Sequence, residues 1–175
     1  MSMPKLLESK ALLSFVKASM PKGCKMVNAN AFYWSPRTKT LHFVEERLGD
    51  ATGQAALLHE ACHALLDHTK YSTDAELLML EVDAWNKAKE LAAGIKLDID
   101  PEHIEDCLDT YREWLYARST CPTCRTTSLQ TDKTMYQCIS CGASWHVSPS
   151  RFCRVYRMRS RNSKTPPQSP RTVFA

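Results

Sequence analysis

The chain has 175 residues, which is enough for one ordinary domain and a small second module. Hydrophobic residues make up 43% and charged residues 24%, as in a globular protein, and no apolar run approaches the ~20 residues of a membrane-spanning helix. The first residues also lack the apolar core of a secretory signal, so we expect a cytoplasmic protein with no membrane partner.

The net charge of +4 is unevenly distributed along the chain. Residues 118–175 hold ten Lys and Arg residues against one acid, Asp132, so this segment carries +9 and the first 117 residues carry −5. The split predicts separate modules. We place a first domain at 1–117, a second at 118–157 and a basic, Ser- and Pro-rich tail, expected to be disordered, at 158–175.

The first predicted elements are a helix and a β-hairpin. Residues 5–19 predict an amphipathic helix that ends before Pro21. Its apolar positions near helical spacing are Leu6, Leu12, Leu13 and Val16. Two β-like runs follow at 31–34 and 40–44, and the polar segment between them is a plausible turn.

Three further helices are predicted. The second helix covers about 50–67. The third covers 73–93, because Thr73 with Glu76 three residues later is a capping-box pattern. The fourth begins at Pro101, a residue type favoured at the first helical position. Helices, a hairpin or short sheet, and a small C-terminal module together predict an α+β fold.

The second helix carries the sequence His59-Glu60-Ala61-Cys62-His63. Residues four apart lie on one face of a helix, so His59 and His63 can point at one metal ion while Glu60 reaches the water bound to it. The alternative is an ordinary amphipathic helix with two histidines.

A catalytic zinc takes a third protein ligand. The metzincin pattern, HExxHxxGxxH, needs glycine at position 66 and histidine at position 69, but the chain has Leu66 and Thr69 there. On one continuous helix, His68 would turn away from the pair. On the third helix, Glu81 projects into the middle of an apolar arc, whereas Asp83 projects among polar residues. A buried carboxylate needs a metal or an ionic partner, so we expect Glu81 as ligand, with a structural salt bridge as the alternative.

This pattern resembles the gluzincin metallopeptidases, in which HExxH is followed by a glutamate on the next helix. Residues 57–68 and 81–85 look like the corresponding segments of compact ImmA/IrrE-type peptidases, and the likeness covers about 40–93. Asp83 departs from that pattern, in which a second Glu is usual. The resemblance implies a zinc-dependent endopeptidase with Glu60 as general base, cleaving a protein regulator such as a DNA-bound repressor, as in a phage or mobile-element gene.

Two further parts of a peptidase site are less defined by the sequence. An extended substrate could pair with the edge of the hairpin around 41–44. An oxyanion-stabilising residue is also needed, and the candidates are His68, Tyr71 and His103.

A second metal site is predicted from two C-x-x-C pairs separated by thirteen residues. This is a zinc-ribbon spacing, in which four thiolates hold one structural ion, so we expect two zinc ions per chain. The predicted ligands are Cys121, Cys124, Cys138 and Cys141. The remaining cysteines, expected as reduced thiols, are Cys24, Cys62, Cys107 and Cys153.

Basic and aromatic residues follow or lie within the predicted ribbon. Arginines that attract phosphates, interleaved with rings on which bases stack, suit nucleic acid, although a charge run can also be a solvated tail. These residues are Trp145, Arg151, Phe152, Arg154, Tyr156, Arg157, Arg159 and Arg161.

Two other interpretations stay open. The first is a protease of the SprT/Spartan kind, acting on DNA–protein crosslinks, which needs a histidine as third ligand; here His68 or His103 would serve. The second is a non-catalytic, nucleic-acid-binding zinc protein whose HExxH site is structural or inactive.

Overall fold

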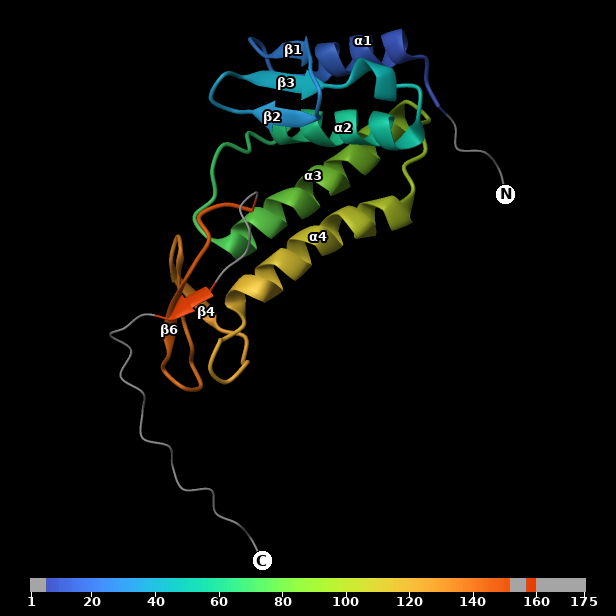
Figure 1. The fold of residues 1–175 in the computed structure, drawn as a ribbon. Helices are drawn as coiled ribbons and strands as arrows, with labels where there is room; N and C mark the ends of the chain where they lie inside the picture. The colour runs from blue at the N-terminus through green and yellow to red at the C-terminus, as the bar shows by residue number, and fades with distance from the viewer. Residues whose placement is uncertain (1–5, 152–156, 160–175) are drawn as a thin grey trace, which may run out of the picture. The chain divides into compact units, whose positions relative to one another are not determined.

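The computed structural model describes residues 6–151 and 157–159, which form the predicted α+β fold. The chain divides into two compact units, one comprising 1–71 and 76–109 and the other 72–75 and 110–175. Among the described residues, the first unit holds a three-stranded sheet and the second a four-stranded sheet (Figure 1). The limits predicted from the charge split, 117/118 and 157/158, stay predictions.

Helix α1 (Ser9–Ser19) begins later than the predicted residue 5, because Glu8 precedes it in an extended conformation. Leu12 and Val16, one turn apart, are fully buried, which explains the amphipathic pattern. At the other end, Met20 is extended, as expected for a residue that precedes proline. The predicted helix is therefore confirmed, with a shorter first turn.

The predicted hairpin forms from β2 (Tyr33–Ser35) and β3 (Thr40–Phe43), which pair antiparallel with Trp34 opposite Leu41. A strand that the sequence did not predict, β1 (Lys25–Asn28), pairs parallel with β3. Most of its residues are exposed, so its sequence lacks the alternation by which a half-buried strand is recognised.

The strand order β1-β3-β2 corrects one expectation about substrate pairing. Strand β3 is central, so Leu41 and His42 pair on both sides and offer no open edge, and Val44 lies beyond the end of the strand. The outer strands are β1 and β2, and β2 lies beside helix α2 (Figure 1).

Helix α2 (Ala51–Leu65) carries the HExxH segment and has a well-defined start. The Asp50 side chain accepts a hydrogen bond from the backbone N–H of Gly53 at 2.6 Å, which satisfies one of the first amides of the helix. A Cβ atom on Gly53 would lie 1.8 Å from the carbonyl oxygen of Arg47, so only glycine fits there. The helix ends at Leu65, and Asp67 has a left-handed φ of 53°.

Two long helices follow, α3 (Asp74–Gly94) and α4 (Pro101–Ser119). In the first unit, apolar side chains from α1, α2, α3, β3 and the first turns of α4 form one core, which includes Leu41, Leu58, Trp85 and Ile104. Each helix in the described residues is too short or too polar to span a lipid bilayer.

The second unit contains β4 (Leu129–Asp132), β5 (Met135–Gln137), β6 (Ser144–Val147) and β7 (Arg157–Arg159), paired in that order. Its small core includes Tyr136, Trp145 and Val147 with three of the predicted zinc-binding cysteines. Two residues of the expected tail, 158 and 159, belong to β7; residues 160–175 lie outside the described residues.

Candidate metal centres

Helix α2 brings the two histidines of the HExxH segment together. The Nε2 atoms of His59 and His63 lie 3.1 Å apart, as expected for residues one turn apart on one helical face. His59 is only 6% exposed. Buried imidazoles with converging nitrogens need a shared partner, and such a partner comes from α3.

Glu81 is that partner. Its Oε2 lies 3.1 Å from His59 Nε2 and its Oε1 lies 3.6 Å from His63 Nε2. The carboxylate is buried, whereas Asp83 is exposed, so Glu81 and not Asp83 joins the histidines. The helical arc of the sequence predicted this difference between the two acids.

The group has dimensions that suit a metal ion. Its three ligand atoms lie within 4.8 Å of one another. Zinc–nitrogen and zinc–oxygen bonds of about 2.1 Å in tetrahedral geometry separate neighbouring ligand atoms by about 3.4 Å. The two histidine nitrogens are 3.1 Å apart, and each lies 3.1 or 3.6 Å from a different oxygen of Glu81, so these separations bracket this value. Two imidazoles and one carboxylate are also the donor set of catalytic zinc sites in which a fourth position is left for water.

The ionisation of the group reflects the same proximity. Burial by itself raises the pKa of Glu81, but the hydrogen bonds and charges of His59 and His63 outweigh it and hold that pKa well below its ordinary value. Burial by itself lowers the pKa of His63, and Glu81 reverses this effect, so the net shift is upward. The same three residues therefore also suit the structural ion pair that the sequence raised as an alternative. The pair uses both oxygens of Glu81, whereas a metal site needs one ligand atom from each of the three residues.

Glu60 lies beside this group. The backbone N–H of Trp34 in β2 donates a hydrogen bond of 2.7 Å to Oε2 of Glu60. The Glu60 carboxylate also acts electrostatically on His63. A carboxylate next to the candidate ligands, with one oxygen held by the main chain, is suitably placed for proton transfer at this site.

The rings of His59 and His63 are supported differently on their other sides. The His59 ring stacks on Trp85 with centroids 4.2 Å apart, and its Nδ1 is buried with no hydrogen-bond partner among the described residues. His63 Nδ1 lies 2.9 Å from Nδ1 of His68. The sequence gave no signal that Trp85, four residues after Glu81 on α3, contacts a histidine.

The position of His68 corrects an expectation. On a continuous helix this residue would point away from the pair, but α2 ends at Leu65 and the left-handed Asp67 turns the chain back. His68 therefore contacts His63, on the ring nitrogen that does not face Glu81.

The other candidate residues lie outside the three-residue group. His103 packs edge-on against Trp85, with centroids 5.8 Å apart, and its Nε2 is 3.8 Å from Sγ of Cys107. Tyr71 is half-buried. Among the described residues, the candidate metal group at α2 and α3 contains neither of these nor His68.

The four predicted ribbon cysteines also converge. Their Sγ atoms lie within 4.8 Å of one another, with Cys121–Cys141 at 3.7 Å and Cys124–Cys138 at 3.4 Å. Zinc–sulfur bonds of about 2.3 Å in a tetrahedron separate sulfurs by about 3.8 Å, close to these values. Four cysteines complete a tetrahedral shell, so this group suits a structural ion.

The two cysteines of the second C-x-x-C pair, Cys138 and Cys141, differ in how readily they lose a proton. Burial raises the pKa of Cys138, but hydrogen bonds from Ser128 and from the backbone N–H groups of Ser140 and Cys141 outweigh it and lower the pKa to about 6. The Ala143 amide favours the Cys141 thiolate, but desolvation and the neighbouring thiols outweigh it and raise that pKa to about 12. The neighbouring thiols thus oppose loss of the Cys141 proton, and a bound cation would favour its thiolate.

The remaining cysteines outside the two groups carry thiols, as predicted, where the structure describes them. Cys62 is fully buried, and this burial raises its pKa to about 12. Cys24 and Cys107 are partly buried. Cys153 lies outside the described residues.

A buried charge pair supports the second unit. Arg118 is 1% exposed, and its Nε donates to Oδ2 of Asp74 at 2.5 Å. Tyr136 donates to the same carboxylate oxygen, and Arg118 also donates to the carbonyl oxygen of Ser148. The sequence counted Arg118 only as one of the basic residues. Its charge is satisfied internally.

The basic region is only partly available to a partner. Arg157 donates to the carbonyl oxygen of Thr120, and Arg151 lies 3.6 Å over the ring of Tyr111. Trp145 is fully buried, so its predicted stacking on a base is wrong. Phe152, Arg154, Tyr156 and Arg161 lie outside the described residues.

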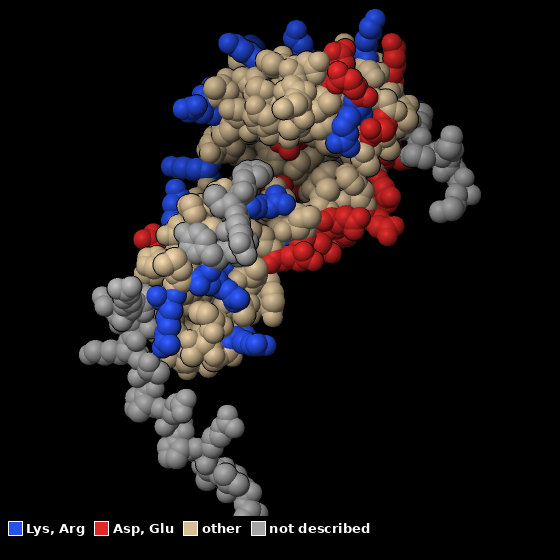
Figure 2. All heavy atoms as spheres, viewed as in Figure 1, with Lys and Arg blue, Asp and Glu red and all other residues tan. Residues whose placement is uncertain are grey.

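Exposed basic side chains remain in this unit, among them Arg125 and Lys133. Figure 2 shows Lys and Arg atoms gathered over the ribbon strands.

Comparisons of the chain with protein-family models, curated proteins and solved structures gave no match.

Proposed function

We propose that this protein is a zinc-dependent endopeptidase of the gluzincin type. The observation that carries the proposal is that two imidazole nitrogens from α2 and a buried carboxylate from α3 converge, with separations that suit the ligands of one metal ion. His59, His63 and Glu81 would hold the catalytic zinc ion. The four ribbon cysteines would hold a second, structural one.

A bound zinc ion would lower the pKa of its water to ~7 and polarise a carbonyl group. Glu60 would accept a proton from the attacking water and pass it to the leaving amine. The Trp34 N–H holds one oxygen of this carboxylate, which would leave the other oxygen to exchange the proton. The adjacent strand β2, an outer strand of its sheet, would align an extended substrate.

The proposed substrate is a protein inside the cell, such as a DNA-associated regulator. The exposed basic residues of the second unit support contact with nucleic acid, because they attract phosphates. The thiol state of the described cysteines agrees with a reducing compartment.

The decisive experiment combines a metal count with a cleavage assay on the full chain, using denatured, fluorescently labelled casein. The purified protein should contain two zinc ions, and a His59→Ala/His63→Ala double variant should contain one. Glu60→Gln should keep both ions and lose cleavage by about 10²- to 10⁴-fold, the range for removal of a general base.

Glu81→Gln and Asp83→Asn form a matched pair on one helix. Glu81→Gln should lose the catalytic zinc, whereas Asp83→Asn should retain both ions, because only Glu81 faces the histidines. Zinc retained in Glu81→Ala would favour a histidine ligand, as in the SprT/Spartan interpretation. DNA binding without cleavage, unchanged by Glu60→Gln, would favour the non-catalytic protein.

A further inference from the structure

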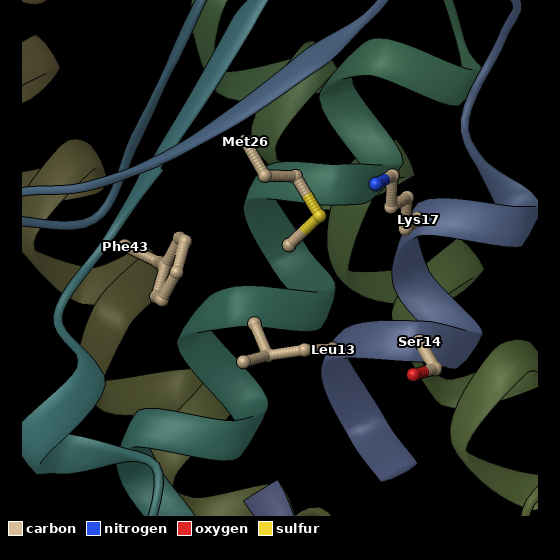
Figure 3. A pocket seen from close by; sticks show the side chains of 5 residues that line it. All are labelled: Leu13, Ser14, Lys17, Met26 and Phe43. Carbon is tan, nitrogen blue, oxygen red and sulfur yellow. The ribbon is translucent and has the colours of Figure 1, made fainter. Parts of the chain in front are cut away.

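An open groove lies between α1 and the sheet of the first unit. Leu13, Met26 and Phe43 form its apolar lining, and Ser14 and Lys17 line it from the exposed side of α1 (Figure 3). Its volume is about 220 Å³. This is enough space for one large apolar side chain, and no residue of either metal group lines it.

The open edge of β1 borders this groove. Backbone N–H groups of Lys25 and Ala29 donate to Lys39 and Phe43 of the neighbouring segment. In a parallel pair, alternate residues face the partner strand, so the backbone groups of Met26 and Asn28 face outward. Met26 therefore belongs to the groove through its side chain and to the open edge of β1 through its backbone.

The segment that holds α1 and β1 is basic, although the first 117 residues are acidic overall, and the acid Glu45 from outside this segment contacts Asn28 at the end of β1. Between residues 6 and 30 the only acid is Glu8, and the basic residues, all exposed, are Lys10, Lys17, Lys22 and Lys25. Figure 2 shows blue side chains along the margin where Figure 1 places α1 and β1. No salt bridge within the described residues uses these lysines.

We propose that this groove and the edge of β1 bind an extended, acidic peptide segment of a partner protein. The segment would add a strand to β1, place a large apolar side chain between Leu13, Met26 and Phe43, and set its carboxylates near Lys17 and Lys25. Main-chain pairing would supply affinity, and the groove with its lysines would supply selectivity. Binding of this kind does not depend on the proposed peptidase activity.

The test uses the full chain and a fluorescein-labelled heptapeptide, Thr-Asp-Leu-Asp-Phe-Glu-Thr. Saturable binding should appear below about 1 mM and should weaken with added salt. Ser14→Trp should fill the groove from an exposed position, and Lys17→Glu should reverse the charge at its mouth. Each variant should weaken binding by about tenfold or more.

Matched controls separate the groove from general effects. Ala11→Trp places the same ring at an exposed position of α1 that does not line the groove, and Lys89→Glu makes the same charge change on α3. Both should bind as the unchanged protein does. The His59→Ala/His63→Ala variant should also bind the peptide normally, so this proposal can survive if the peptidase proposal fails.

Nuclear magnetic resonance of the ¹⁵N-labelled protein would locate the peptide. Amide shifts should concentrate in β1 and α1. The proposal would be overturned by an absence of saturable binding, or by Ser14→Trp binding the peptide as tightly as the unchanged protein. Amide shifts confined to β2 and α2 would also overturn it.

Discussion

At the scale of single residues, the candidate metal group depends on how its two histidines are held. The sequence spacing places both on one face of α2, but the orientation of each ring is set by a different neighbour. His63 is held by a contact between its Nδ1 and His68. His59 has no such contact and instead stacks on Trp85. Partners behind metal-binding histidines fix their orientation and often influence metal affinity strongly.

Trp85→Leu should therefore weaken zinc binding at the α2–α3 site by about 10- to 100-fold, the range for such supporting residues. Trp85→Phe keeps an aromatic face and should recover most of the affinity. Competition with a chromophoric chelator measures the affinity, and the visible spectrum of the cobalt-substituted protein reports ligand geometry. A Trp85→Leu protein that is folded and binds zinc as tightly as the unchanged protein would contradict this role.

At the scale of secondary-structure elements, the start of α2 determines where the HExxH residues fall. Asp50 accepts hydrogen bonds from the Gly53 amide and the Thr52 hydroxyl. The Thr52 hydrogen bond is the main reason that the pKa of Asp50 is lowered, with the Gly53 amide second. The ionised form is therefore favoured by folding.

Asp50→Ala should lower the free energy of unfolding by about 1 kcal/mol at neutral pH, because a helix loses its N-cap. Since the folded pKa lies below the unfolded value, this contribution is present above the unfolded pKa and disappears as pH falls through the folded pKa. Urea unfolding at neutral and acidic pH measures the difference. The exposed Asp83→Ala serves as control, and an Asp50→Ala effect that persists in strong acid would disprove the capping explanation.

The strands of the first unit show how an element acquires a role from its neighbours. β2 is an outer strand whose Trp34 amide contacts Glu60, and β1 is an outer strand bordering the groove on α1. β3 pairs on both sides and offers its edge to no partner. The availability of a strand edge therefore follows from sheet order.

At the scale of the whole molecule, the described part of each unit contains one group of residues that could hold a metal. The histidine–glutamate group is part of a unit with a large apolar core, whereas the cysteine group belongs to a unit with a small one. A small core rarely supports folding without a metal or disulfide. The two groups should therefore differ in their effect on stability.

Cys138→Ser should lower the zinc content to one ion and unfold the ribbon around residues 119–147. The first unit should retain its helices and its own zinc. Limited proteolysis followed by mass spectrometry would detect cleavage confined to the ribbon, with the His59→Ala/His63→Ala variant as the comparison. A protected ribbon in the Cys138→Ser protein would show that its apolar core folds without metal.

Some features of this protein follow from sequence alone because they depend on local spacing. Residues four apart share a helical face, so His59 and His63 converge wherever a helix forms. The C-x-x-C pairs are local in the same sense. Helical periodicity also distinguished Glu81 from Asp83, because burial of one face of α3 leaves the other face to solvent.

Only the tertiary structure decided the contacts between segments distant in sequence. It paired β1 with β3, stacked Trp85 on His59, buried Trp145 and ended α2 early enough for His68 to return to His63. The physical reason is that hydrogen bonds within a helix or strand fix the relative positions of its own residues. The residue that a side chain contacts on another element depends instead on how all the elements pack together.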